Sequence, residues 1–321
     1  MTVTPEAEQP NVLLLAGRYD LTCDYVVANL RRRSVPYLRL NTEDFANSAV
    51  ELDPVHRRLV IERDGRSYCV TPQTLRSVLF RRPVFLRDYG DDHRSPSERF
   101  SCLQWAAFVR NLMLFSEARW INDPAATYRA EHKAVQLSVA AQIGFTVPQT
   151  RITNAPHPHS LGDGSAQIAI KGLDTVLLRA GGDEMFGFTT FESSEKLEPK
   201  HWRTAPATIQ AALTNKLDVR VTVIEDRVFA ASITTNGNPV VEDWRQHKRD
   251  VDFHSFDLPP DIAQRCRVLV NSLGLRFGGI DLAMCNGKFY FLEINPTGEW
   301  AWLVDAAGLP IDEALAHALS R

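Results

Sequence analysis

Three oxygen-bearing side chains stand in one otherwise apolar stretch, and they are the residues best suited to hold a metal ion. The stretch, residues 278–295, reads GGIDLAMCNGKFYFLEIN, and the side chains belong to Asp281, Glu293 and Asn295. Carboxylate and amide oxygens suit Mg²⁺, which usually accompanies nucleotide phosphates. We therefore predict a Mg²⁺ site. The alternative is a hairpin at a sheet edge whose acids are solvated, although an unpaired charge is costly beside so many large apolar residues.

The loop of this hairpin decides whether the two carboxylates can meet. The Asn-Gly pair at 286–287 is typical of a two-residue loop. Such a loop would place Ile280 opposite Glu293 and turn Asp281 to the other side of the sheet, because a slip of one residue turns every side chain over. A three-residue loop, 286–288, places Asp281 directly across from Glu293. A shared metal site therefore requires the three-residue loop.

The second strand of the hairpin should present two of the ligands side by side. Side chains alternate along a strand, so Glu293 and Asn295 are predicted to share a face, roughly 7 Å apart. On this pattern the remaining residues divide into Phe289 and Phe291 on the same face, and Tyr290, Leu292 and Ile294 on the other.

A second alternating strand carries an aspartate and an arginine that could both contact a nucleotide. Residues 218–223 read DVRVTV, so Asp218 and Arg220 share one face while the valines face the core. An aspartate can accept hydrogen bonds from ribose hydroxyls, and an arginine can hold phosphate oxygens. The alternative is a half-exposed strand with a solvated polar face.

Two lysines complete the set of candidate phosphate contacts. Lys133 lies among apolar neighbours on a predicted helix, 127–143, where a lysine needs an anion unless its stem reaches water. Lys171 ends a predicted strand, 167–171, ahead of a glycine turn, as in a phosphate-holding lid, although the chain has no GxxxxGK[ST] motif there. Arg81, at the end of a predicted strand, is interpreted either as a solvated residue or as a contact for an anionic substrate.

Composition limits the class of protein. The chain has 321 residues, a formal charge of −3 and five cysteines without a CxxC pair. The charge argues against an extended nucleic-acid surface, and the scattered cysteines are typical of reduced thiols. No apolar run is long enough for a membrane span. We expect a cytoplasmic globular protein with neither nucleic acid nor membrane as a partner.

The order of elements predicts an α/β protein with several subdomains. Strands at 11–17 and 37–41 flank a helix at 21–33, which is a βαβ opening. The helix 97–115 is apolar around most of its circumference, so it is either buried, which we favour, or shared with a second subunit in a homodimer. We expect domains at 1–124, 125–208 and 209–321.

The chain resembles the ATP-grasp ligases, most closely the peptide-modifying branch that makes microviridins and other graspetides. The resemblance runs over nearly the whole length, and the Asp281, Glu-x-Asn spacing is its most specific part. It implies an N-terminal Rossmann-like α/β domain, a lid subdomain and a C-terminal antiparallel-sheet domain, with ATP between the sheets. The similar blocks are RLNTEDF (39–45), WINDP (120–124), VPQTRITN (147–154), LDVRVTVIEDRVFAASI (217–233), EDWR (242–245) and the segment 278–302.

The same resemblance implies roles for individual residues. Asp281, Glu293 and Asn295 would hold two Mg²⁺ ions, and Arg245 would lie near the acyl-phosphate and the acceptor. The chain departs from many relatives at Ala211-Ala212, where an acidic and an aromatic residue are usual, so adenine contacts there would fall to the backbone. The remaining implied nucleotide contacts are Lys133, Lys171, Gln210 at the adenine hinge, Asp218 at the ribose and Arg220 at the phosphates.

The activity implied is that of an ATP- and Mg²⁺-dependent macrocyclase. An Asp or Glu carboxylate of a ribosomal precursor peptide, which carries a leader and a core, would be activated as an acyl-phosphate. A Thr or Ser hydroxyl or a Lys amine of the same peptide would then form an ester or an amide. One alternative is a ligase that joins amino acids or glutamate to a small molecule or a protein tail. The other is an inactive peptide-binding module on the same fold.

Overall fold

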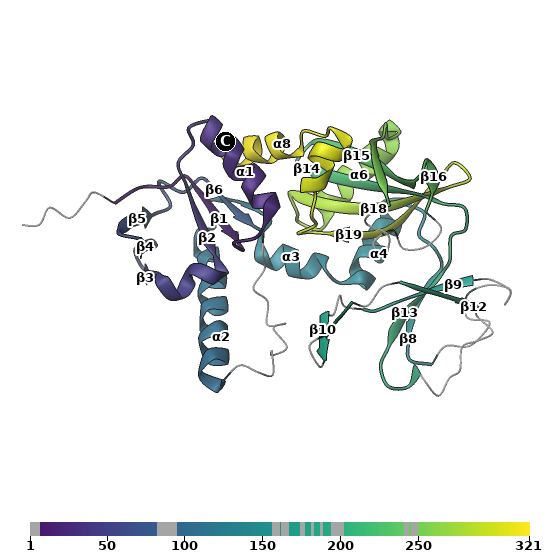
Figure 1. Cartoon of the computed structure of the whole chain (residues 1–321), viewed down its shortest axis with the longest axis horizontal. Helices are drawn as coiled ribbons and strands as arrows, with labels where there is room; N and C mark the ends of the chain where they lie inside the picture. The colour runs from purple at the N-terminus through teal and green to yellow at the C-terminus, as the bar shows by residue number, and fades with distance from the viewer. Residues whose placement is uncertain are drawn as a thin grey trace, which may run out of the picture.

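The structure is a computed structural model of the whole chain, shown in Figure 1. It describes residues 7–81, 95–155, 161, 167–173, 177–180, 183–186, 189–193, 202–240, 244 and 250–321. Three bodies follow one another along the chain: a parallel sheet with its helices, a smaller antiparallel sheet, and a larger antiparallel sheet.

The first body is built on a parallel sheet, which confirms the predicted α/β opening. Its strands lie in the order β2-β1-β6-β7. All residues of β1 are buried, as expected for a strand covered on both faces. The side chain of Asp20 caps the helix that follows by accepting a hydrogen bond from the amide of Cys23. The elements are β1 (Val12–Ala16), α1 (Leu21–Arg32), β2 (Tyr37–Asn41), β6 (Ser77–Phe80) and β7 (Arg119–Ile121).

A three-stranded antiparallel sheet is inserted between β2 and β6. It runs β3-β4-β5, and the Asp64-Gly65 pair, both at positive φ, turns β4 into β5. The sheet packs onto the same core as one face of the parallel sheet. Its strands are β3 (Ala49–Asp53), β4 (Arg58–Arg63) and β5 (Arg66–Val70), and a 3₁₀ segment, Thr42–Asn47, precedes them.

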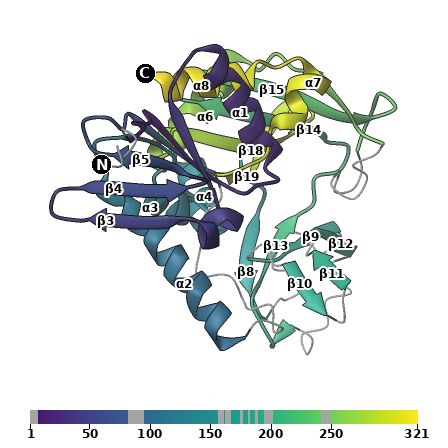
Figure 2. The same ribbon diagram turned by 60° about the vertical axis from the view of Figure 1, so that its left-hand side comes forward.

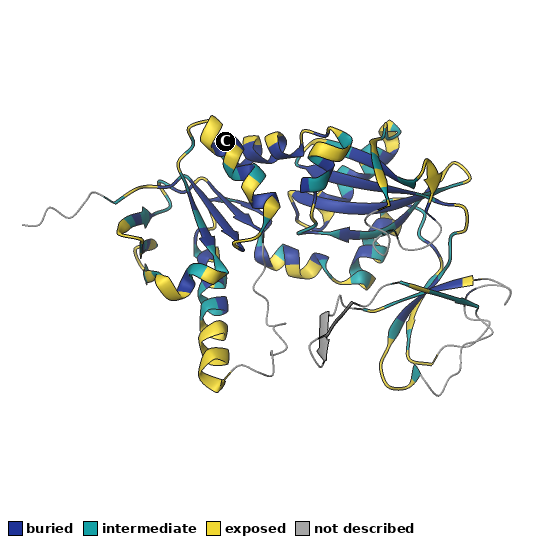
Figure 3. Cartoon of the chain, viewed as in Figure 1, coloured by how far each residue is buried: buried dark blue, intermediate teal, exposed yellow. Residues whose placement is uncertain are grey.

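The helix predicted to be buried is exposed over its first half. α2 (Pro96–Asn111) begins with a capping box made by Ser95 and Glu98, and a 3₁₀ turn, Leu112–Leu114, follows it. Phe100 is 64% exposed and Leu103 46% exposed, and the lower part of α2 projects from the body in Figures 2 and 3. The favoured interpretation as a core helix is therefore wrong for this part, whose residues 95–104 are all exposed.

The single helix predicted over 127–143 is two helices. α3 (Pro124–Ala130) is capped by the side chain of Asp123, and two residues separate it from α4 (Lys133–Gln142). His132 is extended at the break, with φ −75° and ψ 111°. Lys133 therefore lies in the first turn of α4 instead of on the middle of a long helix.

The second body is a small antiparallel sheet. Its order is β12-β9-β13-β8, and a separate hairpin pairs β10 with β11. The strand predicted over 167–171 is confirmed as β9. The elements are β8 (Thr150–Thr153), β9 (Gln167–Lys171), β10 (Leu177–Ala180), β11 (Asp183–Phe186), β12 (Thr190–Ser193) and β13 (Ala207–Ala211).

The third body is a six-stranded antiparallel sheet that carries the predicted metal ligands. Its order is β16-β15-β14-β18-β19, with β17 beside β15. One face packs on α6 together with α3 and α4, and the other packs on α7 and α8. Its elements are β14 (Leu217–Ile224), β15 (Arg227–Thr235), β16 (Asn238–Pro239), β17 (Asp252–Ser255), α6 (Pro260–Ser272), β18 (Phe277–Cys285), β19 (Lys288–Asn295), α7 (Ala301–Ala307) and α8 (Ile311–Ser320).

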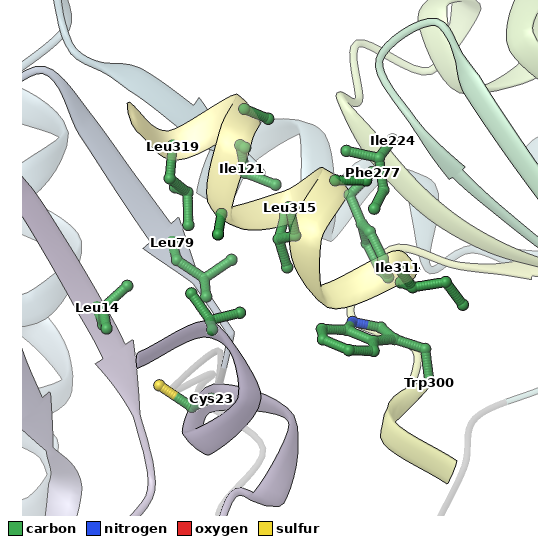
Figure 4. Close-up of a cluster of buried hydrophobic side chains, with 14 of the residues drawn as sticks. Leu14, Cys23, Leu79, Ile121, Ile224, Phe277, Trp300, Ile311, Leu315 and Leu319 are labelled. Carbon is green, nitrogen blue, oxygen red and sulfur yellow. The ribbon is translucent and has the colours of Figure 1, made fainter. Parts of the chain in front are cut away.

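One hydrophobic core joins the first and third bodies, as Figure 4 shows. Leu315 and Leu319 of α8 pack between the first sheet, which contributes Leu79, and the third, which contributes Ile224 and Phe277. A buried hydrogen bond of 2.7 Å from the Asn29 amide to Asp312 ties α1 to α8. The six-stranded sheet is thereby fixed relative to the N-terminal sheet. Among the described helices, none has the length and apolarity needed to cross a membrane.

Candidate nucleotide and metal site

The two carboxylates predicted to share a metal are cross-strand partners, but not for the predicted reason. The loop of the hairpin has two residues, since Cys285 pairs with Lys288, and both Asn286 and Gly287 have positive φ. The predicted three-residue loop is therefore wrong. A register shift between Leu282 and Asp281 leaves one extra residue in β19, so that Asp281 still lies opposite Glu293. The β-bulge therefore produces the register that we expected from a three-residue loop.

The bulge also changes which side chains share the ligand face. Phe289 and Phe291 are buried in the core beneath the sheet together with Ile294. The prediction that both phenylalanines share a face with Glu293 is therefore wrong, because the extra residue reverses the alternation between 291 and 293. Glu293 and Asn295 do lie together: the Asn295 amide nitrogen is 3.5 Å from a Glu293 carboxylate oxygen.

Each of the two carboxylates meets a cation. Arg220 on β14 lies opposite Asp281, and its Nη1 donates to Oδ1 over 2.8 Å. The Nζ of Lys133 lies 3.1 Å from Oε2 of Glu293. The alternative in which β14 is a half-exposed strand is wrong, since Arg220 is 5% exposed. The site thus brings Lys133 and Arg220, both predicted phosphate contacts, onto both carboxylates predicted to bind the metal.

The guanidinium of Arg220 is enclosed by glycines. A Cβ atom added to Gly279 or to Gly298 would lie 2.5 Å from its Nη2 atom. Its Nε atom is buried and has no hydrogen-bond partner among the described residues. Asp281 supplies one anion to this cation, and the unbonded Nε leaves a buried donor without an acceptor, which fits a further contact with a phosphate.

The loop after β19 is held by a residue of the first sheet. Arg81 donates from Nη1 to the carbonyl oxygen of Thr297, and its Nε lies 3.2 Å from an oxygen of Asp20. Arg81 is only 8% exposed. The burial of Arg81 and its bonds to Thr297 and Asp20 contradict the interpretation as a solvated strand end.

Asp218, the predicted ribose contact, is buried beside Lys216 on the same strand face. The two side chains form an ion pair and each is 9% exposed. Sequence reasoning missed Lys216, although the period of two that joins Asp218 to Arg220 also includes residue 216.

The two candidates on the smaller sheet also lie together. The Nζ of Lys171 donates to Oε1 of Gln210 over 2.9 Å, and the amide nitrogen of Gln210 donates to the hydroxyl of Thr150 over 3.0 Å. The three residues come from adjacent strands β9, β13 and β8. Arg245, predicted to lie near the acceptor, is outside the described residues.

The chemistry of the ligand set fits a hard divalent cation. Within the described ranges no group of three His, Cys, Asp or Glu side chains could hold a metal by itself. Asp281, Glu293 and Asn295 instead provide two carboxylates and one amide. Mg²⁺ commonly binds through one or two carboxylates and completes its shell with water and substrate phosphates.

Two buried side-chain amides that the sequence analysis did not single out support the ligand strands. Asn122 donates to the carbonyl oxygens of Phe277 at 2.9 Å and of Pro296 at 2.7 Å. Gln136 bonds to the backbone of Ile294. The available signal for Gln136 was a polar residue on the apolar side of the helix that carries Lys133.

Comparison with solved structures identifies the class of fold: it is the ATP-grasp fold. No protein-family model matches the sequence, and no curated protein matches it.

The solved structures that it resembles include a macrocyclase and ATP-grasp ligases in complex with precursor peptides. It is similar to the macrocyclase MdnC bound with precursor peptide MdnA from Microcystis aeruginosa MRC, with a TM-score of 0.80, 23% identity and coverage of 96% of this chain and 98% of that one. It is also similar to a RiPP-associated ATP-grasp ligase from Chryseobacterium gregarium, in complex with ADP and a leader and core peptide. The TM-score is 0.81 and the identity 20%, with coverage of 97% of this chain and 96% of that one. For ATP-grasp ligase PsnB, complexed with a phosphomimetic variant of minimal precursor, Mg and ADP, the TM-score is 0.73 and the identity 20%, with coverage of 97% of this chain and 98% of that one.

Proposed function

We propose that this protein is an ADP-forming ligase that uses ATP and Mg²⁺ to join side chains within a ribosomal precursor peptide. The observation that carries the proposal is the pairing of Asp281 with Glu293 on one sheet face, with Arg220 and Lys133 against them. Two acids and two cations in one place suit a magnesium nucleotide. The similar structures contain ADP, Mg or precursor peptides, which supports the same substrates here.

The proposed roles follow the positions of the residues. Asp281, Glu293 and Asn295 hold Mg²⁺, which when bound neutralises charge on the phosphates. Arg220 and Lys133, now paired with carboxylates, turn to phosphate oxygens when the nucleotide enters. Asp218 accepts hydrogen bonds from the ribose, Lys171 and Gln210 contact the nucleotide from the smaller sheet, and Arg245 lies beside the acyl-phosphate and the acceptor.

The reaction has two steps. A carboxylate oxygen of a peptide Asp or Glu attacks the γ-phosphorus of ATP, the bond from that phosphorus to the bridging oxygen breaks, and ADP leaves. A hydroxyl of Thr or Ser, or an amine of Lys, then attacks the acyl carbon, loses its proton, and expels inorganic phosphate. Each ester or amide costs the peptide one water and consumes one ATP. Closure of the smaller sheet over the site keeps water from the acyl-phosphate.

The proposal extends to the organisation of the molecule. The domains are taken as 1–124, 125–208 and 209–321, and the protein acts in the cytoplasm. The exposed apolar residues Phe100 and Leu103 on α2 support a homodimer through this helix.

A peptide assay tests the function. The protein is incubated with ATP, Mg²⁺ and a candidate precursor encoded beside its gene, and the peptide is analysed by mass spectrometry. The proposal requires loss of one water per bond together with ADP formation. Ligation of free amino acids or glutamate in place of ring formation would favour the small-molecule ligase. Peptide binding without ATP hydrolysis would favour the inactive binding module.

A further inference from the structure

The edge strand β19, which carries Glu293 and Asn295, is hydrogen-bonded to groups outside the sheet. β19 is the last strand of the six-stranded sheet, so one side of its backbone has no neighbouring strand among the described residues. Phe291 donates its amide to the carbonyl oxygen of Thr146 over 2.8 Å on this side. Leu292, the extra residue, follows directly, and the ladder is interrupted there. The next residue is Glu293, the first of the two proposed ligands on this strand. Without support on the outer side, the backbone at this point would be poorly fixed.

The support at that point comes from one side chain. The amide nitrogen of Gln136 donates to the carbonyl oxygen of Ile294 over 2.8 Å, and its Oε1 accepts from the amide of Ile294 over 3.1 Å. The same nitrogen donates to the carbonyl oxygen of Ala130 over 2.6 Å at the end of α3. Gln136 is 3% exposed. The side chain therefore pairs with both backbone groups of the residue between Glu293 and Asn295, as a neighbouring strand would.

Gln136 and Lys133 reach the same strand from one helix but hold different parts of it. Lys133 lies one turn earlier on α4 and bonds to the side chain of Glu293. The proposed function requires Lys133 to leave Glu293 when a magnesium nucleotide binds. The two backbone bonds of Gln136 involve no atom that contacts metal or phosphate, so they remain when that exchange takes place.

We infer that Gln136 is a positioning residue for the metal site: it fixes the backbone between Glu293 and Asn295 so that their oxygens stay in place when Lys133 changes partner. This inference rests on the proposed function. It assigns to α4 a task separate from the phosphate contact expected of Lys133. Misplacement of a ligand by about 1 Å is enough to weaken its contribution severely.

The test measures metal binding directly. Gln136→Met keeps an unbranched side chain of similar length and removes both bonds to Ile294 together with the bond to Ala130. Gln142→Met places the same change on an exposed residue of α4. With Mn²⁺ as the probe and ADP present, electron paramagnetic resonance should show a Kd for Mn²⁺ at least tenfold higher for Gln136→Met and unchanged for Gln142→Met. The Kd for ADP without metal should change less than twofold, and high Mg²⁺ should restore turnover.

Other outcomes separate this inference from the proposed function. A wild-type protein that binds no Mn²⁺ in the presence of ADP overturns both. A wild type that binds Mn²⁺, with equal affinity in folded Gln136→Met, overturns this inference alone, even if the variant melts at a lower temperature. If Gln136→Met does not fold, Gln136→Glu, which keeps an acceptor for the Ile294 amide and loses the donor, decides in the same assay: unchanged Mn²⁺ affinity overturns the inference.

Discussion

Asp281 on β18 lies directly across from Glu293 on β19, although the loop between the strands has the wrong length for that pairing and a single extra residue corrects it. The structure thus places two negatively charged side chains next to each other, so each needs a positive partner. Arg220 and Lys133 supply the balancing charges.

Removal of either carboxylate should abolish ligation and leave the fold intact. We expect Asp281→Ala and Glu293→Ala to lower kcat by about 10²–10³-fold, the usual effect of removing a group that stabilises charge at a reacting centre. Peptide conversion is followed by mass spectrometry and folding by circular dichroism. Glu313→Ala, at an exposed acid on α8, is the matched control. Undiminished turnover in either variant would end the metal assignment.

The glycines around Arg220 should matter through that side chain, and a Cβ at Gly298 would also lie 3.2 Å from the Cβ of Asn295. A methyl group at Gly279 or Gly298 meets the end of the Arg220 side chain, so Gly279→Ala and Gly298→Ala should fold while displacing the guanidinium. A displacement of about 1 Å can cost about 10²-fold in rate. We expect kcat/KM for ATP to fall by at least about tenfold in steady-state assays.

The control for this prediction is Gly65→Ala, which lies outside the site. Its added Cβ meets open space but is strained by a φ of +73°. It should lower the melting temperature and leave kcat/KM unchanged. Normal ATP kinetics in both site variants would show that Arg220 does not need its enclosed position.

The ion pair of Lys133 with Glu293 should compete with nucleotide when no metal is present. Glu293→Gln removes the charge that holds Lys133, so we expect metal-free ADP to bind about twofold to fivefold more tightly, in line with the strength of a partly exposed ion pair. The same variant should bind ADP with Mg²⁺ more weakly than the wild type. Isothermal titration with and without Mg²⁺ measures both. Weaker binding of metal-free ADP would contradict the exchange of partners proposed for Lys133.

The buried thiols should be unreactive at moderate pH. Burial raises the pKa of the Cys23 and Cys266 thiols to about 12, from an ordinary value of 9.0. Both stay protonated at pH 8, while Cys102 is exposed. Iodoacetamide should therefore label Cys102 before Cys23 or Cys266, which mass spectrometry of digested protein can resolve. Because the folded pKa is raised, stability from these thiols is lost as pH rises from about 9 towards about 12. Rapid labelling of Cys266 in folded protein at pH 8 would contradict its burial.

A charge on the exposed face of α2 should disrupt the proposed homodimer. Phe100 and Leu103 are three residues apart and share a helix face. Leu103→Glu should convert a dimer into a monomer in analytical ultracentrifugation, whereas Gln104→Glu, on the same helix and also exposed, should not. A wild type that is monomeric at all concentrations would refute the dimer.

Local patterns in the sequence were sufficient for much of the fold, and the exceptions have physical reasons. β1, β2 and β6 follow from short apolar runs bounded by turn residues. The break at His132 does not follow, because α3 and α4 are both helical in pattern and the cap by Asp123 fixes only the first of them. Exposure of α2 depends on what packs beside it, which periodicity cannot reveal.

The sequence predicted which candidate residues lie near one another better than it predicted the geometry that brings them together. The pairing of Asp281 with Glu293 followed from the need of two carboxylates to meet at a shared metal, and the pairing itself is confirmed. The bulge was not foreseen because turn chemistry and ligand chemistry gave conflicting registers, and an extra residue inside a strand leaves no local signal. Contacts such as those of Gln136 and Arg81 join distant segments, so they appear only in three dimensions.

The bond from Arg81 to the carbonyl of Thr297 also limits how the protein can be recombined. This bond links the first sheet to the loop that encloses Arg220, although more than two hundred positions separate them in the chain. A chimaera that exchanged the N-terminal portion with a relative lacking this arginine would keep every residue of the six-stranded sheet and still lose the bond that holds the loop beside Arg220.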